Sequence, residues 1–185
     1  RNYPITGYVI KKFIHKDDAW AGNDAETLEK PFPIIRYAEI LLSYVEALNN
    51  LTGGHTITDA EGNSQTFTRD VNEMAKYFNM IRYRAGLPGL TSAELSSPDQ
   101  MFDLIVRERM IEFLHENRRF YDVRRWGIYE EVDKEPIVGM DTESRKDGYY
   151  ERTVVNHPIA RNRKVERKMI WLPISRQEIR KVPKM

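Results

Sequence analysis

The chain has 185 residues, a length that suits a single domain with a sizeable core. Its 29 basic and 28 acidic residues leave a formal net charge of +1, whereas domains that bind nucleic acid usually carry a clear basic excess, so we expect no nucleic-acid partner. The absence of cysteine excludes disulfides, zinc–thiolate sites and cysteine nucleophiles.

The first elements in chain order are an extended segment, a loop and a long helix. Residues 1–15 are strand-like, and because they start without a methionine we expect the sequence to be a fragment that lacks its upstream part. Residues 16–30 are polar and aperiodic, which predicts a loop. A helix is predicted over residues 33–51, because one helical face carries Ile34, Ala38, Leu41, Leu42, Val45 and Leu48.

The middle of the chain predicts a turn region and two further helices. Residues 55–68 alternate weakly and fit either a small hairpin or a polar loop. A second helix is expected from residue 70 to residue 85. A third is expected to start at Ser97 as N-cap, with a capping box completed by Gln100. Its predicted apolar positions are Phe102, Ile105, Val106, Met110, Phe113 and Leu114.

The last third is predicted to be irregular between short helices. A short helix is expected over residues 118–126, and a capping box of Ser175 and Glu178 predicts the start of a final helix. The extended apolar run at residues 169–175 is expected to place Trp171 in the core. The prediction is therefore a mainly α fold, a single unit over residues 1–185 with long loops at about 16–30, 52–69 and 129–168.

The stretch "RERMIEFLHENRRFYDVRRWG" (residues 107–127) is dense in opposite charges. On a helix, Glu108, Glu112 and Glu116 form a ladder of like charges, which costs about 0.2–0.5 kcal/mol per adjacent pair unless cations intervene. Arg109 lies on the apolar face and is expected to need a carboxylate partner. Cations expected to fold back onto the ladder are Arg118, Arg119, Arg124 and Arg125. We interpret the stretch as a structural ion-pair network of Arg109, Glu108, Glu112, Glu116, Arg119, Asp122, Arg124 and Arg125.

Two other interpretations of this stretch are possible. Glu112-x-x-His115 has the spacing of a helical metal-ligand pair, but a di-metal carboxylate site needs a second such pair and the sequence has none. The arginines suit phosphate binding, but interleaved carboxylates compete with that ligand. We therefore predict no catalytic residue, no metal and no cofactor. A metal-dependent hydrolase built on Glu112 and His115 is the alternative from another functional class.

Four motifs, in order, resemble the C-terminal half of the SusD/RagB family: "PFPIIRYAEILLSYVEALN", "NMIRYRAGLPGL", "IVRERMIEFLHENRRFYDVRRWG" and "WLPISRQEI". Asn117 departs from the resemblance, since a glycine is common there, and so does the ending "KVPKM". The resemblance implies a SusD-like helical fold with irregular loop insertions and short strand-like segments. That fold would be incomplete without its N-terminal tetratricopeptide-like half.

The resemblance also implies a function. Members are surface-exposed, lipid-anchored outer-membrane proteins of Bacteroidetes that capture nutrients, most often glycans, for a TonB-dependent (SusC-like) transporter. We therefore expect a non-enzymatic glycan-binding protein whose lipid anchor lies in the missing N-terminal part. A RagB-type peptide-binding component is the alternative, and an interaction domain with no ligand of its own is a further one.

The ligand site is expected on irregular loops. Glycans bind flat aromatic rings, with amide, carboxylate or guanidinium groups bonding the hydroxyls. The predicted ligand-binding residues are Trp20, Asn23, Asp24, Tyr149, Tyr150 and Arg152. The basic run at residues 161–168 is expected to be a solvated loop, with contact to anionic lipid or to a partner as the alternative.

Overall fold

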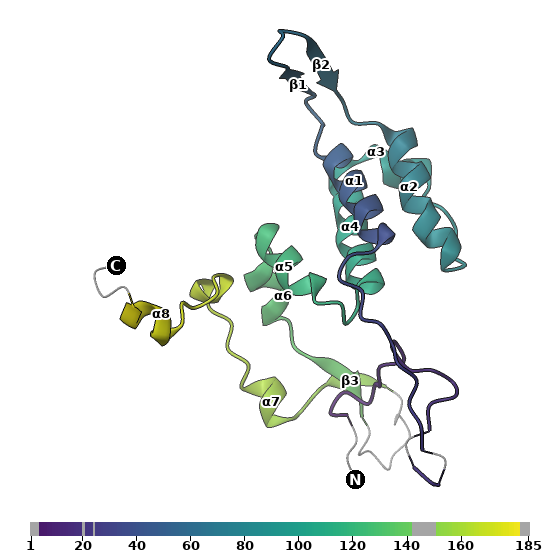
Figure 1. Cartoon of the computed structure of the whole chain (residues 1–185), viewed down its shortest axis with the longest axis vertical. Coiled ribbons are helices and arrows are strands. Elements are labelled where there is room, and N and C mark those ends of the chain that lie inside the picture. The colour runs from purple at the N-terminus through teal and green to yellow at the C-terminus, as the bar shows by residue number, and fades with distance from the viewer. Residues whose placement is uncertain (1–3, 20, 24, 142–150, 182–185) are drawn as a thin grey trace. The chain divides into compact units, whose positions relative to one another are not determined.

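The computed structural model describes residues 4–19, 21–23, 25–141 and 151–181, which fold as two compact units (Figure 1). The middle unit is Pro31–Arg119. The terminal unit combines Arg1–Lys30 with Phe120–Met185. Each is described by itself, and the single unit over the whole chain stays a prediction. The described residues are mainly helical, as the sequence predicts. None of the described helices is both long and apolar enough to cross a bilayer.

The middle unit is built on three helices that lie side by side: α1 (Tyr37–Asn49), α2 (Val71–Arg84) and α4 (Pro98–Glu112) (Figure 1). The short α3 (Ser92–Ser96) precedes α4. Burial of each large apolar side chain contributes about 1.5–3 kcal/mol, so this core is the main stabilising feature of the unit. Its members are Ala38, Leu41, Leu42, Val45, Leu48, Met74, Phe78, Ile81, Leu95, Met101, Ile105 and Phe113.

Helix caps follow the polar residues that the sequence places at helix starts. The Asp70 carboxylate accepts hydrogen bonds from the backbone N–H groups of Asn72 and Glu73, which fixes the start of α2. Ser97 accepts from the backbone N–H of Gln100, so the predicted start of α4 is confirmed. Helix α3 was not predicted, although its capping box of Thr91 and Glu94 is visible in the sequence.

Helix α1 begins later than the predicted residue 33. Arg36 has φ −139° and ψ 159°, an extended conformation, so the first helical residue is Tyr37. Ile34, placed on the buried stripe by its spacing, is 80% exposed because it precedes the helix. The helical spacing of apolar residues therefore extends beyond the helix itself, and Arg36 pairs with Glu112 and Glu116 instead of starting the helix.

The buried face of α4 is only partly the predicted one. Ile105, Phe113 and Arg109 are buried as expected, whereas Met110 and Leu114, also expected on the apolar face, are 42% and 54% exposed. Glu108 is buried as well. The helix ends at Glu112 because the chain soon turns through left-handed conformations, φ 61° at His115 and φ 64° at Asn117. Asparagine adopts this conformation more readily than most residues, which explains why it can stand where a glycine is common.

A small hairpin connects α1 and α2. Strands β1 (His55–Thr58) and β2 (Ser64–Phe67) pair antiparallel, so the hairpin alternative for residues 55–68 is correct. Every residue of both strands is exposed. Hydroxyl pairs join the strands, with Thr56 Oγ1 2.8 Å from Thr66 Oγ1.

The terminal unit has short elements where a structureless loop was expected over residues 129–168. They are α6 (Tyr129–Lys134), the antiparallel pair β3 (Val138–Met140) and β4 (Arg152–Val154), α7 (Pro158–Arg161) and the 3₁₀ helix η1 (Arg167–Ile170). Before them comes α5 (Arg118–Arg125), whose first two residues belong to the middle unit, and after them α8 (Arg176–Lys181). Most of these elements are too short to be found from periodicity.

Two predictions near the C-terminus have opposite outcomes. Ser175 Oγ accepts a hydrogen bond of 3.2 Å from the backbone N–H of Glu178, so the predicted cap of α8 is confirmed. Trp171 was expected in the core, but it is 79% exposed. An apolar run alone does not show which neighbour covers it, and the described residues do not cover this one.

The opening stretch contacts β3 instead of forming a strand. The Thr6 carbonyl accepts a 2.9 Å hydrogen bond from Met140 N–H, and a Cβ at the neighbouring Gly139 would lie 2.5 Å from the same oxygen. Gly139→Ala is therefore expected to displace residues 4–7 and to destabilise the complete protein by about 1–3 kcal/mol. The matched control is Gly53→Ala, because no atom lies within 4 Å of a Cβ there. Equal melting temperatures of the two variants would contradict this close approach.

Candidate functional site

The predicted ligand residues are only partly within the described structure. Trp20, Asp24, Tyr149 and Tyr150 lie outside the described residues. Asn23 lies in the loop that follows Ala19, and Arg152 begins β4. Both residues are exposed, as contact with a ligand requires, and both belong to the terminal unit.

The loop around Asn23 is braced by one carboxylate. Asp18 accepts hydrogen bonds from the backbone N–H of His15 at 2.8 Å, from that of Leu28 at 3.0 Å and from Lys30 Nζ at 2.5 Å. The backbone N–H of Ala19 also bonds the carbonyl of Glu26, which closes the loop. The hydrogen bond from Lys30, followed by that from His15, lowers the pKa of the Asp18 carboxyl from its ordinary 3.8 to about 2.

This pKa shift predicts the pH dependence of the loop. Because the pKa is lower in the folded state, the stabilisation from Asp18 is complete above about pH 3.8 and is lost as the pH falls through about 2. Asp18→Asn should remove most of this stabilisation at neutral pH. The loss is measured as faster exchange of the His15 and Leu28 amide protons. Asp17→Asn is the control, since that side chain is 62% exposed. Slow exchange in Asp18→Asn would show that the loop does not depend on this carboxylate.

The terminal unit contains a cavity of about 560 Å³. It lies between the end of α6 and the segment that follows it, the end of β4, and α7. Its lining includes residues 133–137, Val154, Val155, Ala160, Arg161, Arg163 and Val165. Predicted residue Arg152 lies two positions before Val154, so both project from the same face of β4. Sequence analysis missed this cavity because it is formed by short elements that periodicity did not reveal.

The middle unit has a second, more apolar pocket of about 390 Å³ between α1 and α2. Its apolar lining consists of Tyr37, Ala38, Leu41, Met80 and Ile81, and Arg36 and Arg84 supply its charge. Both arginines form ion pairs with Glu112. The pocket therefore offers apolar contact area more than polar recognition.

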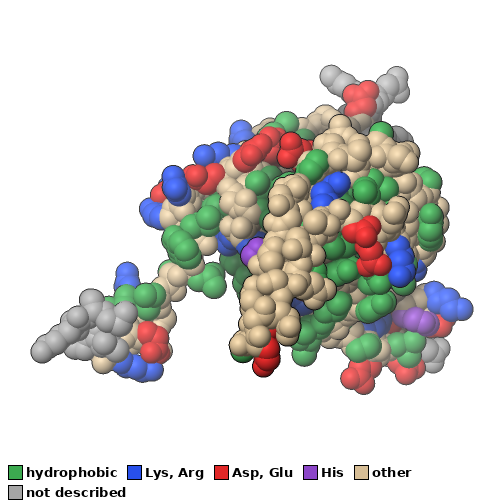
Figure 2. Space-filling model, turned by 90° about the horizontal axis from the view of Figure 1, so that it is seen from above, with side chains coloured by type: hydrophobic (Ala, Val, Ile, Leu, Met, Phe, Trp, Pro, Cys, Tyr) green, Lys and Arg blue, Asp and Glu red, His purple; other side chains and the backbone are tan. Residues whose placement is uncertain are grey.

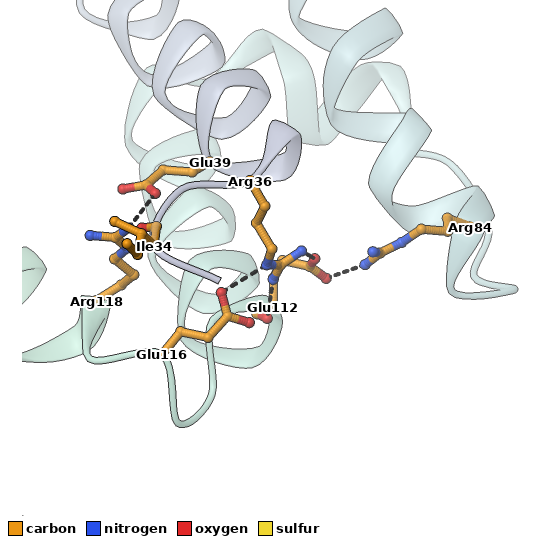
Figure 3. A network of polar contacts seen from close by, with 7 residues as sticks. All are labelled: Ile34, Arg36, Glu39, Arg84, Glu112, Glu116 and Arg118. Atoms are coloured by element: carbon orange, nitrogen blue, oxygen red, sulfur yellow. Dashed lines mark hydrogen bonds and ion pairs between the residues drawn. The ribbon is translucent and has the colours of Figure 1, made fainter. Parts of the chain in front are cut away.

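An ion-pair network joins the start of α1 to the end of α4 (Figure 3). Arg36 contacts Glu112 Oε1 through Nη1 at 2.5 Å and Glu116 Oε2 through Nε at 2.7 Å. Its Nη2 donates to the Glu112 carbonyl at 2.6 Å, and its guanidinium lies 4.8 Å from the centre of the Phe113 ring. Arg84 of α2 reaches Glu112 Oε2 at 2.5 Å. Burial opposes the charge of Arg36, but the hydrogen bonds that it donates to Glu116 and Glu112 outweigh this effect and raise the Arg36 pKa.

Glu108, the remaining member of the glutamate ladder, pairs with Arg82 of α2. Arg82 Nη1 lies 3.4 Å from Glu108 Oε2, and Arg82 Nε donates to the Pro88 carbonyl at 2.6 Å. Burial raises the pKa of the Glu108 carboxyl, and the charge of Arg82 offsets part of that rise. The sequence analysis did not identify Arg36, Arg82 or Arg84 as ladder partners, because all three come from distant parts of the chain.

Two of the arginines expected to fold back onto the ladder, Arg118 and Arg124, have other contacts in the described residues. Arg118 pairs with Glu39 at 2.8 Å and donates to the carbonyl of Ile34 (Figure 3). Arg124 donates to the carbonyls of Phe120 and Met169, with its guanidinium 3.6 Å from the Phe120 ring centre. For Arg119, Nη1 is buried and makes no hydrogen bond to a described residue.

Two further members of the predicted network pair with each other. Arg125 Nε donates to Asp122 Oδ1 at 2.9 Å, three residues away on α5. Asp122 is buried, whereas the Arg125 side chain is 43% exposed. Arg109 is 4% exposed and donates to Ser43 Oγ at 3.2 Å.

The helical metal pair proposed for Glu112 and His115 does not have helical geometry. Glu112 is the last residue of α4, and His115 has φ 61°. Glu112 itself contacts Arg36 and Arg84. Within the described residues no three histidine, cysteine, aspartate or glutamate side chains are grouped as metal ligands require.

Charges of both signs and apolar side chains are interspersed over the face drawn in Figure 2, in keeping with a net charge of +1. The carboxylate and guanidinium groups of the network in Figure 3 bond mainly to each other, which suits a structural role. The cavity of the terminal unit combines apolar and charged lining, the mixture that ligand sites use.

Comparison with known proteins identifies the family. SusD-like protein P2 of Formosa agariphila is 31% identical over 117 residues, which are 60% of this chain and 20% of that protein. The chain thus spans about a fifth of the length of this relative. No solved structure matches the chain. A sequence profile described as "SusD family" matches residues 1–185, and the chain therefore belongs to the SusD family.

Proposed function

We propose that the protein is a non-enzymatic component of nutrient uptake that captures glycans at the cell surface. The observation that carries this proposal is the match of the family profile to the whole of residues 1–185. The cavity of the terminal unit supports it, because about 560 Å³ lies within the range of small-ligand pockets, roughly 300–1,000 Å³.

The glycan site that we propose lies on the terminal unit. It combines the loop braced by Asp18, which presents Asn23, with the aromatic residues Trp20, Tyr149 and Tyr150 predicted from sequence. Asp24 and Arg152 add a carboxylate and a guanidinium for the sugar hydroxyls. Stacking on the aromatic rings would supply most of the affinity, and the polar groups would select the sugar.

The partner and location follow from the family resemblance. We propose a lipid-anchored position on the outer membrane, facing outward, with a TonB-dependent transporter as partner. Isolation of the native complex from detergent-solubilised membranes tests this directly. Recovery of the protein from the soluble fraction without any transporter would contradict both parts.

The ligand class is tested with the complete protein by affinity electrophoresis and calorimetry against polysaccharides and peptide mixtures. We expect glycan binding, weakened in Trp20→Ala with an unchanged melting temperature, and largely retained in the control Trp20→Phe. Binding of peptides alone would replace the glycan proposal by the RagB-type alternative. A lower melting temperature with unchanged affinity would instead place Trp20 among the structural residues.

A further inference from the structure

The basic run at residues 161–168 contributes two arginines with different roles to the cavity of the terminal unit. Arg163 Nη2 donates to the carbonyl of Asp133 and, at 2.6 Å, to the carbonyl of Glu135. These carbonyls lie at and just after the end of α6, where the last helical carbonyls lack intrahelical partners. Arg163 therefore shapes the cavity by fixing the end of α6.

Arg161 lines the same cavity but does not bond the carbonyls at the end of α6. It is exposed at the end of α7, and among the described residues its side chain has no hydrogen bond or ion pair. A guanidinium presents two parallel N–H groups that match the two oxygens of a carboxylate. The third lining cation among the described residues, Lys134, pairs with Glu130 at 3.7 Å, so Arg161 is the lining guanidinium that remains available for a ligand.

The other lining groups restrict what the ligand can be. Asp133 and Glu135 bring carboxylates, which accept hydrogen bonds from hydroxyls and repel densely anionic ligands. Val154, Val155 and Val165 supply an aliphatic surface suited to C–H groups. A hydroxyl-rich ligand with a single negative charge per residue satisfies all three kinds of group.

We propose that this cavity binds a uronic acid residue of an acidic polysaccharide, with the sugar carboxylate on Arg161. Asp133 and Glu135 accept hydrogen bonds from the sugar hydroxyls, and the valines contact the C–H groups of the ring. This proposal rests on the proposed glycan-binding function and specifies its ligand class. It also gives part of the basic run at residues 161–168 a role beyond that of a solvated loop.

The test compares Arg161→Gln with Arg180→Gln in the complete protein, because Arg180 is also exposed but lies on α8, outside the cavity lining. The probes are acidic polysaccharides with different uronic acids, each paired with its carboxyl-reduced form. We expect an acidic member to bind, and its affinity to fall at least about tenfold on carboxyl reduction or in Arg161→Gln. Arg180→Gln should retain the affinity, whereas Arg161→Lys should retain only part of it, because lysine keeps the charge without the planar fork. Added salt should narrow the difference in affinity between the wild type and Arg161→Gln.

The outcomes separate this proposal from the function on which it rests. If glycans bind equally with and without their carboxylates, or if Arg161→Gln binds normally, the uronic acid proposal is wrong and glycan capture stands. If no glycan binds, acidic or neutral, both are wrong. Arg161-dependent binding of vesicles that contain anionic phospholipid, without binding of any acidic glycan, would assign the cavity to lipid headgroups.

Discussion

Arg36→Ala is expected to lower the free energy of unfolding of the complete protein by about 3 kcal/mol or more. The Arg36 guanidinium pairs with Glu112 and Glu116, whose side chains are only 10% and 3% exposed. Loss of one partner from a buried ion pair costs about 3–5 kcal/mol, because the remaining charge stays buried without full compensation. We place the effect near the lower limit, because Arg84 still contacts Glu112. Urea unfolding followed by circular dichroism measures it.

The chain offers a matched control for this variant. Arg84 contacts the same carboxylate, but its side chain is 59% exposed, and exposed ion pairs contribute only about 0–1 kcal/mol. Arg84→Ala should therefore be close to wild type. Arg36→Lys should recover part of the loss, because lysine keeps the charge without the planar fork that reaches both glutamates. Equal stability of Arg36→Ala and Arg84→Ala would mean that the network does not fix the start of α1.

Arg109→Ala is expected to destabilise the complete protein by roughly 3–5 kcal/mol and to leave ligand binding unchanged in any protein that folds. Arg109 is 4% exposed, bonds Ser43 of α1 and lies 5.2 Å from the centre of the Phe113 ring. Glu46, three residues after Ser43 on α1, is also buried. Removing the guanidinium would take a positive charge from this interior and leave a cavity. The loss is large compared with a domain stability of about 5–15 kcal/mol.

Arg107→Ala is the matched control for Arg109, because Arg107 lies on the same helix but is exposed. Exposed substitutions of this kind usually change stability by less than about 0.5 kcal/mol. Melting temperature and glycan affinity should be measured together for both variants. A fully stable Arg109→Ala protein that has lost its ligand would show that the arginine-rich stretch is a binding site after all.

The sequence was sufficient wherever local chemistry decides the structure. The helix expected over residues 70–85 is observed as Val71–Arg84, and Ser97 and Ser175 mark two further helix starts as predicted. These signals are readable because a cap and its partner lie within three residues of each other. The four ordered motifs identified the SusD family, which the profile match confirms, and the mainly helical fold agrees with it.

The sequence was insufficient where partners are far apart along the chain. It identified Glu108, Glu112 and Glu116 as carboxylates in need of cations but assigned those cations to the following helix. The cations that pair with these glutamates come from segments up to 80 residues away, and they are Arg36, Arg82 and Arg84. It also missed the cavity, whose lining comes from α6, β4 and α7. A helix cap is fixed by neighbours that the backbone itself positions, whereas an ion pair or a cavity wall depends on how separate elements pack, and only the tertiary structure decides that.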